Sequence, residues 1–298
     1  SRPDNWDPTR GFASLPNMTT ANYGYRANVA CLIPSHPLAR TWVKEAVNEM
    51  LFELEHWSDD NGGWLEAPHY AMASYDHYLG AFIKIRNAGL GDYLYSEKLR
   101  KVIEWFAKTS TPPDSRIGGF RHRPPVGNTY LYEPNGEFGI VAYLWRERDP
   151  LFAAQMQWMF RQNNSYRQPG IGGFFPALAG YRLLLLDPAI PEKAPNYGSE
   201  LFPKTGVILR SGFPTDRETQ LYLIQGTNHT HYDNDSGSFT LWGKGRALAD
   251  DFGYNGYAPA SDHNMVDAPS PAGIMTVTTF RTSPLADYVQ GSRGGWTR

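Results

Sequence analysis

The hydrophobic periodicity of the chain changes near residue 200, and this change constrains the fold more than any other feature. From about residue 37 to 190, apolar residues recur at steps of three and four, which is the pattern of a buried helix face. After the proline-containing spacer 188–203, the apolar runs are short, rich in β-branched and aromatic residues, and separated by Gly, Asp and Ser. Helices followed by strands predict an α+β fold.

Residues that favour the start or the end of a helix support the elements predicted from periodicity. Ser96 is a candidate N-cap and Gly89 a candidate helix stop. The predicted helices cover residues 37–54, 67–88, 96–108, 136–145, 150–163 and 175–186. The predicted strands cover residues 205–210, 220–224, 238–242, 246–249 and 274–280.

The connections between the predicted helices are long and rich in glycine, proline and aromatic residues. Loops of this length in a compact domain are usually either functional or disordered. Antiparallel helix pairs whose loops gather at one end describe an α/α toroid as well as a helical repeat, and no fixed period supports the repeat. We therefore expect an incomplete (α/α) toroid of helical hairpins over residues 1–195 and an antiparallel β-sandwich over 196–298. We expect this sandwich to be incomplete, or completed by a further segment or a second copy of the chain.

Composition restricts the partners of the chain. Its 28 Lys and Arg against 30 Asp and Glu exclude a general attraction to nucleic acid. Any binding of an anion must therefore come from a local group of basic residues. No stretch approaches the ~20 apolar residues of a membrane span. The lone Cys31 excludes an internal disulfide and a cysteine-based zinc site. Aromatic residues at 14%, with 29 Gly and 23 Pro, suit a carbohydrate cleft, and an aromatic core with long loops fits equally well.

A cluster of histidines and aspartates in the strand region is the strongest candidate for chemistry. The segment Asn228–Phe239 reads NHTHYDNDSGSF, with His229 and His231 two residues apart. On an extended strand both would project to the same side, where two imidazoles can bind a metal, or one can bind it while the other acts as a base. With Asp251 and His263 downstream, His231, Asp251 and His263 make a zinc-type ligand set. Hydrogen-bonded loop histidines and turn aspartates are the alternative.

These motifs resemble the heparinase II/III-like polysaccharide lyases. The β domain of that family carries an H-x-H-x-D run, then G-x-x-L-x-x-D-x-G, then H-N, which match the chain at residues 229–233, 245–253 and 263–264. Residues 201–210 resemble the start of that domain. In the helical region, GGWLEAPHY at residues 62–70 is similar to the family's G-x-x-x-E-x-x-x-Y segment. The resemblance implies an (α/α) toroid joined to an antiparallel β-sandwich, with the cleft between them.

The resemblance also implies catalytic roles. Lyases of this kind cleave uronic-acid polysaccharides by β-elimination, which requires the carboxylate to be neutralised, the adjacent proton removed and the leaving oxygen protonated. Tyr70 then protonates the leaving group, His229 is the catalytic histidine, and either of them is the base. Asn17 neutralises the carboxylate, although no histidine adjoins it as in the fuller pattern. The implied zinc, held by His231, Asp251 and His263, is structural; no organic cofactor is implied.

Further residues are candidates for binding the anionic sugar. Arg121, His122 and Arg123 follow two glycines, and guanidinium groups bind carboxylates and sulfates bidentately. A solvated loop is the alternative. Trp64 can stack on a sugar face or belong to the core. Glu66 can contact the sugar or cap the following helix.

These features together predict a lyase that acts on a uronic-acid polysaccharide such as alginate, ulvan or a heparin-like chain. We expect a secreted or periplasmic protein, because long anionic glycans do not enter cells intact. An α/α-toroid glycoside hydrolase, which needs two opposed carboxylates, and a non-catalytic glycan-binding module are the alternatives. The sequence leaves open the identity of the uronan and whether cleavage is internal or terminal.

Overall fold

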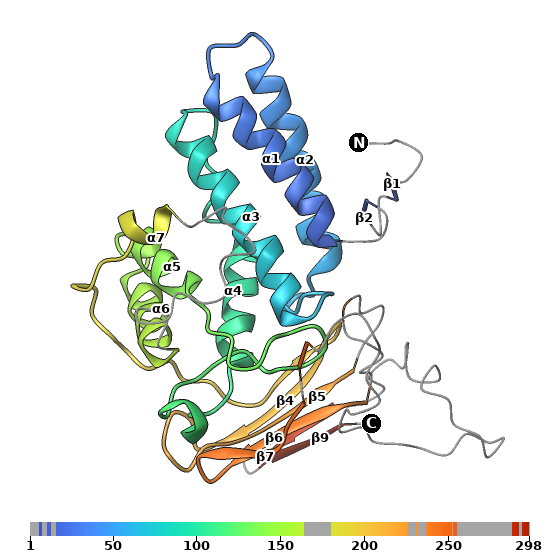
Figure 1. Ribbon diagram of the computed structural model, residues 1–298, viewed down its shortest axis with the longest axis vertical. Coiled ribbons are helices and arrows are strands. Elements are labelled where there is room, and N and C mark those ends of the chain that lie inside the picture. Colours follow the sequence, from blue (N-terminus) through green and yellow to red (C-terminus); the bar gives the residue numbers. More distant parts are fainter. Residues whose placement is uncertain are drawn as a thin grey trace, which may run out of the picture.

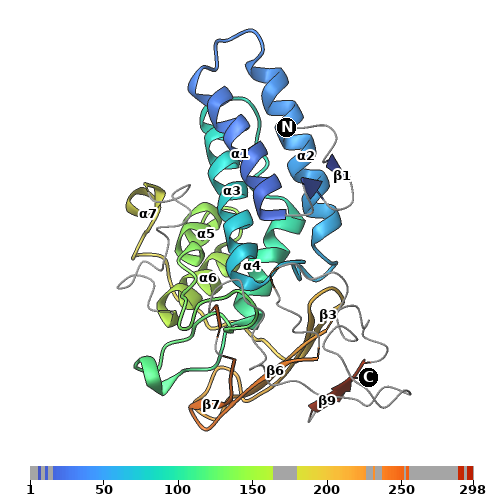
Figure 2. The ribbon, with the colours of Figure 1, turned by 45° about the vertical axis from the view of Figure 1, so that its right-hand side comes forward.

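Helices fill the first part of the chain and strands the second, so the fold is α+β, as the sequence predicts. The structure, a computed structural model, describes residues 6–7, 11–12, 16–163, 180–225, 231, 237–251, 253–254, 288–291 and 294–297. The sheet lies beneath the lower ends of α3 (Pro68–Asn87) and α4 (Glu97–Thr109) in both ribbon views (Figure 1 and Figure 2). Among the described helices, none combines the length and apolar character needed to cross a membrane.

Five of the six predicted helices are confirmed. Proline occupies the first position of α3 and α6, where its missing N–H costs nothing. The Ser96 hydroxyl accepts a hydrogen bond from the backbone N–H of Leu99 at the start of α4. Of the predicted helix 175–186, the described part contains only α7. The described helices are α1 (Pro16–Leu32), α2 (Ala39–Trp57), α3, α4, α5 (Glu137–Trp145), α6 (Pro150–Gln162) and α7 (Tyr181–Leu184).

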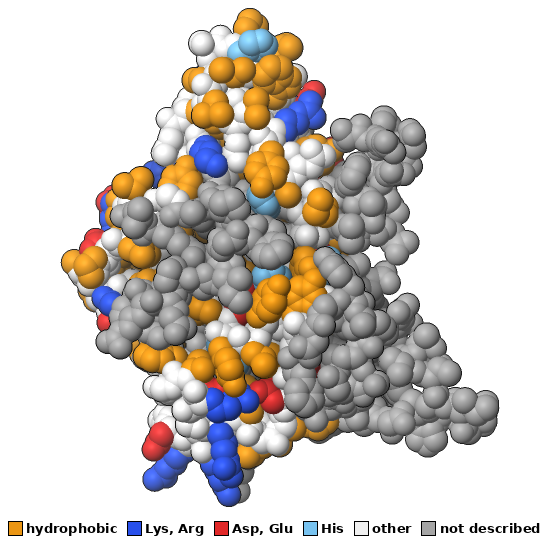
Figure 3. Space-filling model, viewed as in Figure 1, with side chains coloured by type: hydrophobic (Ala, Val, Ile, Leu, Met, Phe, Trp, Pro, Cys, Tyr) orange, Lys and Arg blue, Asp and Glu red, His pale blue; other side chains and the backbone are white. Residues whose placement is uncertain are grey.

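Helix α1 is absent from the sequence prediction because its buried side is small and polar rather than apolar. Thr19, Thr20 and Gly24 lie on that side, which packs against both α2 and α3. Gly24 faces His77 on α3, where a Cβ would be in ordinary van der Waals contact, 3.4 Å from the Cβ of His77. The opposite side of α1 exposes apolar residues such as Leu32. Hydrophobic side chains accordingly gather at the upper end of the helical region (Figure 3).

The main sheet is an antiparallel meander in the order β3-β4-β5-β6-β7. Its strands are β3 (Glu200–Phe202), β4 (Gly206–Ser211), β5 (Thr219–Ile224), β6 (Phe239–Gly243) and β7 (Arg246–Ala249). The four last strands confirm the sequence prediction, whereas the short β3 was not predicted. On β5, buried Gln220, Tyr222 and Ile224 alternate with more exposed residues, which is the period of a strand with one covered face. The predicted strand 274–280 lies outside the described residues.

The described residues include two further small hairpins, one beside α1 and one beside the main sheet. Strands β1 (Trp6–Asp7) and β2 (Gly11–Phe12) pair near the start of the chain, and β8 (Tyr288–Gly291) pairs with β9 (Gly294–Thr297) near its end. Strand β9 lies beside β4, so the described part of the predicted sandwich consists of the five-stranded sheet and this hairpin. Its completion by a further segment or a second copy, and the domain limits 1–195 and 196–298, stay predictions.

A buried ion network joins the helical region to the sheet. Nη2 of Arg121, which lies in the loop after α4, is 2.6 Å from Oε2 of Glu218, and Nε of Arg210 on β4 is 3.1 Å from Oε1 of the same carboxylate. Both arginines also donate to backbone carbonyls just after α4: Nη1 of Arg121 to Thr111 at 3.1 Å, and Nη2 of Arg210 to Ser110 at 3.0 Å. All three charged side chains are buried. The network therefore fixes the sheet against the end of α4.

Candidate active site

Tyr70 lies in the first turn of α3, where the helical region faces the strand region. Because Pro68 begins the helix, Tyr70 projects from its first turn and is only half-buried. Its phenol oxygen is 3.0 Å from that of Tyr254, which follows β7 by five residues in the chain. The backbone N–H of Tyr254 donates to the carbonyl of Thr129, at 3.0 Å, so the second phenol is held by the loop between α4 and α5. Two phenols from distant parts of the sequence thus share one hydrogen bond.

His231 packs flat against the ring of Tyr70. The two ring centroids are 3.7 Å apart and the ring planes differ by 6°. Nδ1 of His231 is 3.1 Å from Oε1 of Glu66, and its carbonyl accepts a hydrogen bond from the N–H of Asn128. His231 has a φ of +62°, a backbone conformation that is uncommon for a histidine. An imidazole from the strand region is therefore held against the phenol from the helical region.

Glu66 connects the residues around Tyr70. It is fully buried at 0% exposure, and its Oε1 accepts the backbone N–H of Asn17 at 3.3 Å, next to Nδ1 of His231. Its Oε2 accepts the indole N–H of Trp64 at 3.2 Å. Asn17 is itself buried at the start of α1, and no described residue hydrogen-bonds to its Oδ1. The structure therefore gathers Asn17, Trp64, Glu66 and Tyr70 with His231, all of which the sequence singles out.

A second histidine, His69, packs against Tyr70 and pairs with a buried carboxylate. Nδ1 of His69 is 2.8 Å from Oε1 of Glu133, and Nη1 of Arg123 is 2.9 Å from the same oxygen. Burial alone would raise the pKa of Glu133, but Arg123 and His69 outweigh it and hold the pKa below its usual range. The ring of His69 meets those of Tyr70 and Tyr130 edge to face, with centroids 5.1 Å apart in each case. This buried pair fixes the backbone and rings next to Tyr70.

Solved structures share this architecture. A crystal structure of heparinase III is 18% identical, with a TM-score of 0.58, over 80% of this chain and 34% of its own. A heparan sulfate lyase from Pedobacter heparinus is 18% identical, with a TM-score of 0.57, over 82% and 33% of the two chains. The chain has the heparinase III fold. This result confirms the fold expected from the sequence resemblance.

The chain spans about a third of the length of these heparinase III-type structures. A second heparinase III structure, 19% identical, matches with a TM-score of 0.56 over 81% of this chain and 33% of that one. No protein-family model matches the chain. No curated protein matches it either. The likeness therefore concerns the fold alone, and the activity is inferred from the site.

In this heparinase III fold, the loop at residues 121–123, which was expected to bind the anionic sugar, forms ion pairs inside the protein. Arg121, His122 and Arg123 are all buried. Arg121 pairs with Glu218, and Arg123 pairs with Glu133. Their placement does not support the predicted role in substrate binding, because each guanidinium is already paired with a carboxylate inside the protein. Trp64 is likewise buried and cannot stack on a sugar from this position.

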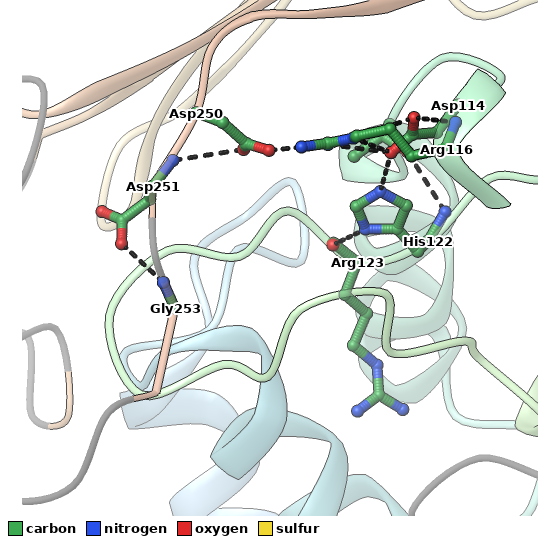
Figure 4. A network of polar contacts seen from close by, with 8 residues as sticks. Asp114, Arg116, His122, Arg123, Asp250, Asp251 and Gly253 are labelled. Atoms are coloured by element: carbon green, nitrogen blue, oxygen red, sulfur yellow. Dashed lines mark hydrogen bonds and ion pairs between the residues drawn. The ribbon is translucent and has the colours of Figure 1, made fainter.

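His122 belongs to a network that ties the same loop to β7 (Figure 4). Its Nε2 lies 3.2 Å from Oδ2 of Asp114, and Arg116 bridges Asp114 and Asp250 at 2.8 and 2.7 Å. Burial would raise the pKa of Asp114, but hydrogen bonds from His122 and Arg116 outweigh it and lower the pKa. The backbone N–H of Asp251 donates to Oδ1 of Asp250. The network therefore holds the strand end from which Tyr254 follows.

The predicted zinc ligands are described only in part. The side chain of His231 lies against Tyr70 and Glu66, and Oδ1 of the buried Asp251 accepts the N–H of Gly253 at 2.9 Å. His263 lies outside the described residues, as does the predicted catalytic His229. Within the described ranges, no three His, Cys, Asp or Glu side chains come together as a metal site. Two imidazoles and a carboxylate are suitable zinc donors. His231 and Asp251 alone do not complete this ligand set.

Sequence reasoning missed Tyr254, His69 and Glu133. Tyr254 directly follows the D-x-G end of the motif at residues 245–253, so its position next to that motif was a usable signal. His69 adjoins Tyr70 in the helical motif. Glu133 has no such signal, because its role depends on the loop folding back under α3.

Proposed function

We propose that the chain is part of a polysaccharide lyase that cleaves a uronic-acid-containing polysaccharide by β-elimination. The contact of Tyr70 with His231, next to Asn17 and Tyr254, is the observation that carries the proposal. It places a phenol from the helical region against an imidazole that lies two residues from His229, the proposed partner of Tyr70 in acid-base catalysis. The names of the neighbouring heparinase III and heparan sulfate lyase structures support the same reaction class.

Each step of β-elimination can be assigned to a residue of the site. The amide of Asn17 is proposed to neutralise the sugar carboxylate, which makes the adjacent proton acidic enough to remove. Tyr70, or His229, takes that proton as the electron pair forms the carbon–carbon double bond. Tyr70 gives a proton to the leaving oxygen, so no water is consumed. Glu66 orients His231 and the backbone of Asn17 through its hydrogen bonds.

A glycoside hydrolase is less well supported by this site. The carboxylates described near Tyr70, those of Glu66 and Glu133, are both buried and are bonded to histidines. An inverting or retaining hydrolase needs two carboxyl groups that reach the sugar from opposite sides. The lyase reading requires no such pair.

The product of cleavage tests the proposal. We expect one member of a panel of alginate, ulvan and heparan-type chains to yield an ultraviolet-absorbing, unsaturated sugar end. We also expect no incorporation of ¹⁸O from labelled water. A reducing end without unsaturation would instead identify a hydrolase, and binding without cleavage would identify a glycan-binding module. Because such chains are extracellular, action outside the cytoplasm is part of this proposal.

Zinc remains part of the proposed function, as a structural ion held by His231, Asp251 and His263. We expect His231→Ala to lower zinc content and the free energy of unfolding together, because the binding energy of a structural metal is folding energy. Zinc per chain is measured by elemental analysis of the purified protein, and stability by chemical denaturation. His36→Ala, at an exposed histidine before α2, is the control and should leave the zinc content unchanged; any loss of stability in it reports the hydrogen bond from Leu38 and the stacking on Trp42 instead. Full zinc occupancy in His231→Ala would remove this residue from the ligand set.

A further inference from the structure

A cavity of about 580 Å³ opens at the end of α3 opposite to Tyr70. It is lined by the last turn of α3, the connection that follows, the end of α5 and helix α7. Arg86 at this end is sixteen residues from Tyr70, and a helix rises ~1.5 Å per residue, so the two are about 24 Å apart along the axis. The cavity is therefore separate from the candidate active site. Its volume is within the range of small-molecule sites.

The cavity carries an excess of positive charge. Arg86, Arg146 and Arg148 line it together with Asp92 and Glu147, which leaves a net charge of +1 (three minus two). Nε of Arg86 is 3.7 Å from Oδ2 of Asp92, and Nη2 of Arg146 is 3.1 Å from Oε1 of Glu147. Arg148 forms no ion pair with a carboxylate among the described residues. Its guanidinium is the donor that the protein leaves available.

Tyr95 gives the cavity a fixed aromatic wall. Its hydroxyl accepts a hydrogen bond from Nη1 of Arg86 at 2.7 Å and donates to the carbonyl of Leu144 at 3.2 Å. The guanidinium carbon of Arg148 lies 4.5 Å from the centroid of the Tyr95 ring. Cation–π contact of this kind orients a guanidinium plane and leaves its N–H groups at the edge for another partner. The wall is thus arranged before any ligand binds, which lowers the entropic cost of binding.

Helix dipoles do not account for all of this charge. Helices α3 and α5 both end at the cavity, and their carboxyl ends carry partial negative charge that Arg86 and Arg146 offset. Arg148 lies three residues beyond the end of α5, and its backbone N–H donates to the carbonyl of Trp145 at 3.0 Å. Its side chain is held by Tyr95 and has no carboxylate partner among the described residues, so its charge can serve a ligand of opposite sign.

We propose that this cavity binds the carboxylate or sulfate group of an anionic sugar, remote from the site of cleavage. Guanidinium groups bind both anions bidentately, and the rings of Tyr95 and Tyr143 hold two of them in place, with Arg148 at 4.5 Å and Arg146 at 3.8 Å from the respective ring centroids. That the anion belongs to a sugar rests on the proposed function. A polysaccharide held here would raise the local concentration of its remaining units at the chain surface. The binding itself does not depend on the proposed lyase activity and is tested without turnover.

Arginine-selective modification with phenylglyoxal tests the site residue by residue. The probes are an unsulfated glucuronate-containing disaccharide, a sulfated one and neutral cellobiose, with the modified peptides read by mass spectrometry. At ~10 times the dissociation constant, we expect an anionic probe to slow modification of Arg148 about tenfold. Arg40, exposed on α2, should react at an unchanged rate. Protection by the sulfated probe alone assigns the site to sulfate, and protection by both includes the carboxylate. The proposal would be overturned if none of the three probes slowed modification of Arg148, or if cellobiose protected it as well as the anionic probes do.

A variant provides the second test. Arg148→Ala removes an exposed side chain without an ion pair, so the fold should be kept. Because a hydrogen bond to a charged group is lost, we expect the concentration of anionic disaccharide that protects Arg86 to rise at least about tenfold. The side chain of Arg86 is 46% exposed and therefore reports from within the same cavity. Arg40→Ala matches the change in net charge and should leave that concentration unchanged. An equal effect of both variants would mean that only overall charge attracts the sugar.

Discussion

Replacing Tyr70 with phenylalanine is expected to slow β-elimination by about 10²–10⁴-fold, the usual contribution of a positioned acid or base. The variant removes only the hydroxyl, which is the group that would exchange protons with the sugar. The ring that stacks against His231 is kept, whereas the hydrogen bond to Tyr254 is lost. We therefore expect the uronan to bind about as well as before. Initial rates are followed by the absorbance of the unsaturated product, and binding is measured by calorimetry.

Tyr25→Phe is the matched control for this loss of a phenol. Tyr25 lies on the outer side of α1 and is 53% exposed, so its replacement should leave rate and binding unchanged. An unchanged rate in Tyr70→Phe would show that another group donates the proton. A parallel loss of rate and binding in Tyr70→Phe would show that the hydroxyl binds the sugar in the ground state instead.

Local sequence signals predicted the elements of the fold but not all of their packing. The apolar periodicity of residues 38–54 and the proline at the start of α3 act within one helix, so both are readable from the sequence. Helix α1 buries small and polar residues, and its helical state depends on close contact with α2 and α3. Its buried side therefore has no stripe of large apolar residues from which the helix could be predicted.

In the candidate site, too, residues within one motif could be predicted from the sequence, whereas contacts between distant segments could not. Glu66 and Tyr70 belong to one short motif and could be selected together. The contact of Tyr70 with His231 joins residues far apart in the sequence, so it depends on how the strand region docks on the helices. Arg121 and Arg123 were read as an exposed basic loop, because a sequence does not show that Glu218 and Glu133 approach from elsewhere to pair with them. Charge in a glycine-rich loop indicates exposure only when no distant partner folds onto it.

Replacing Glu218 with glutamine is expected to lower the free energy of unfolding by about 3–5 kcal/mol, because it leaves two buried guanidinium groups without a carboxylate. Burial lowers the pKa of Arg210 to about 10; Arg121 acts in the same direction, and Glu218 opposes both. Without Glu218, the two like charges would face each other in a site that excludes water. Chemical denaturation with a constant m-value measures the change. Glu45→Gln is the control, since Glu45 pairs with Arg26 at the surface, and such pairs contribute about 0–1 kcal/mol.

One further variant identifies the source of this cost. If unpaired charge is responsible, the triple variant Arg121→Met/Arg210→Met/Glu218→Leu should recover much of the stability lost in Glu218→Gln, because apolar residues then replace both guanidinium groups together with their shared carboxylate. If the backbone hydrogen bonds from Arg121 to Thr111 and from Arg210 to Ser110 dominate instead, the triple variant should be no more stable than the single one. Equal stability of Glu218→Gln and Glu45→Gln would contradict both explanations. It would also show that the sheet is held against α4 by apolar packing, so that the alignment of Tyr70 with Tyr254 does not depend on this ion network.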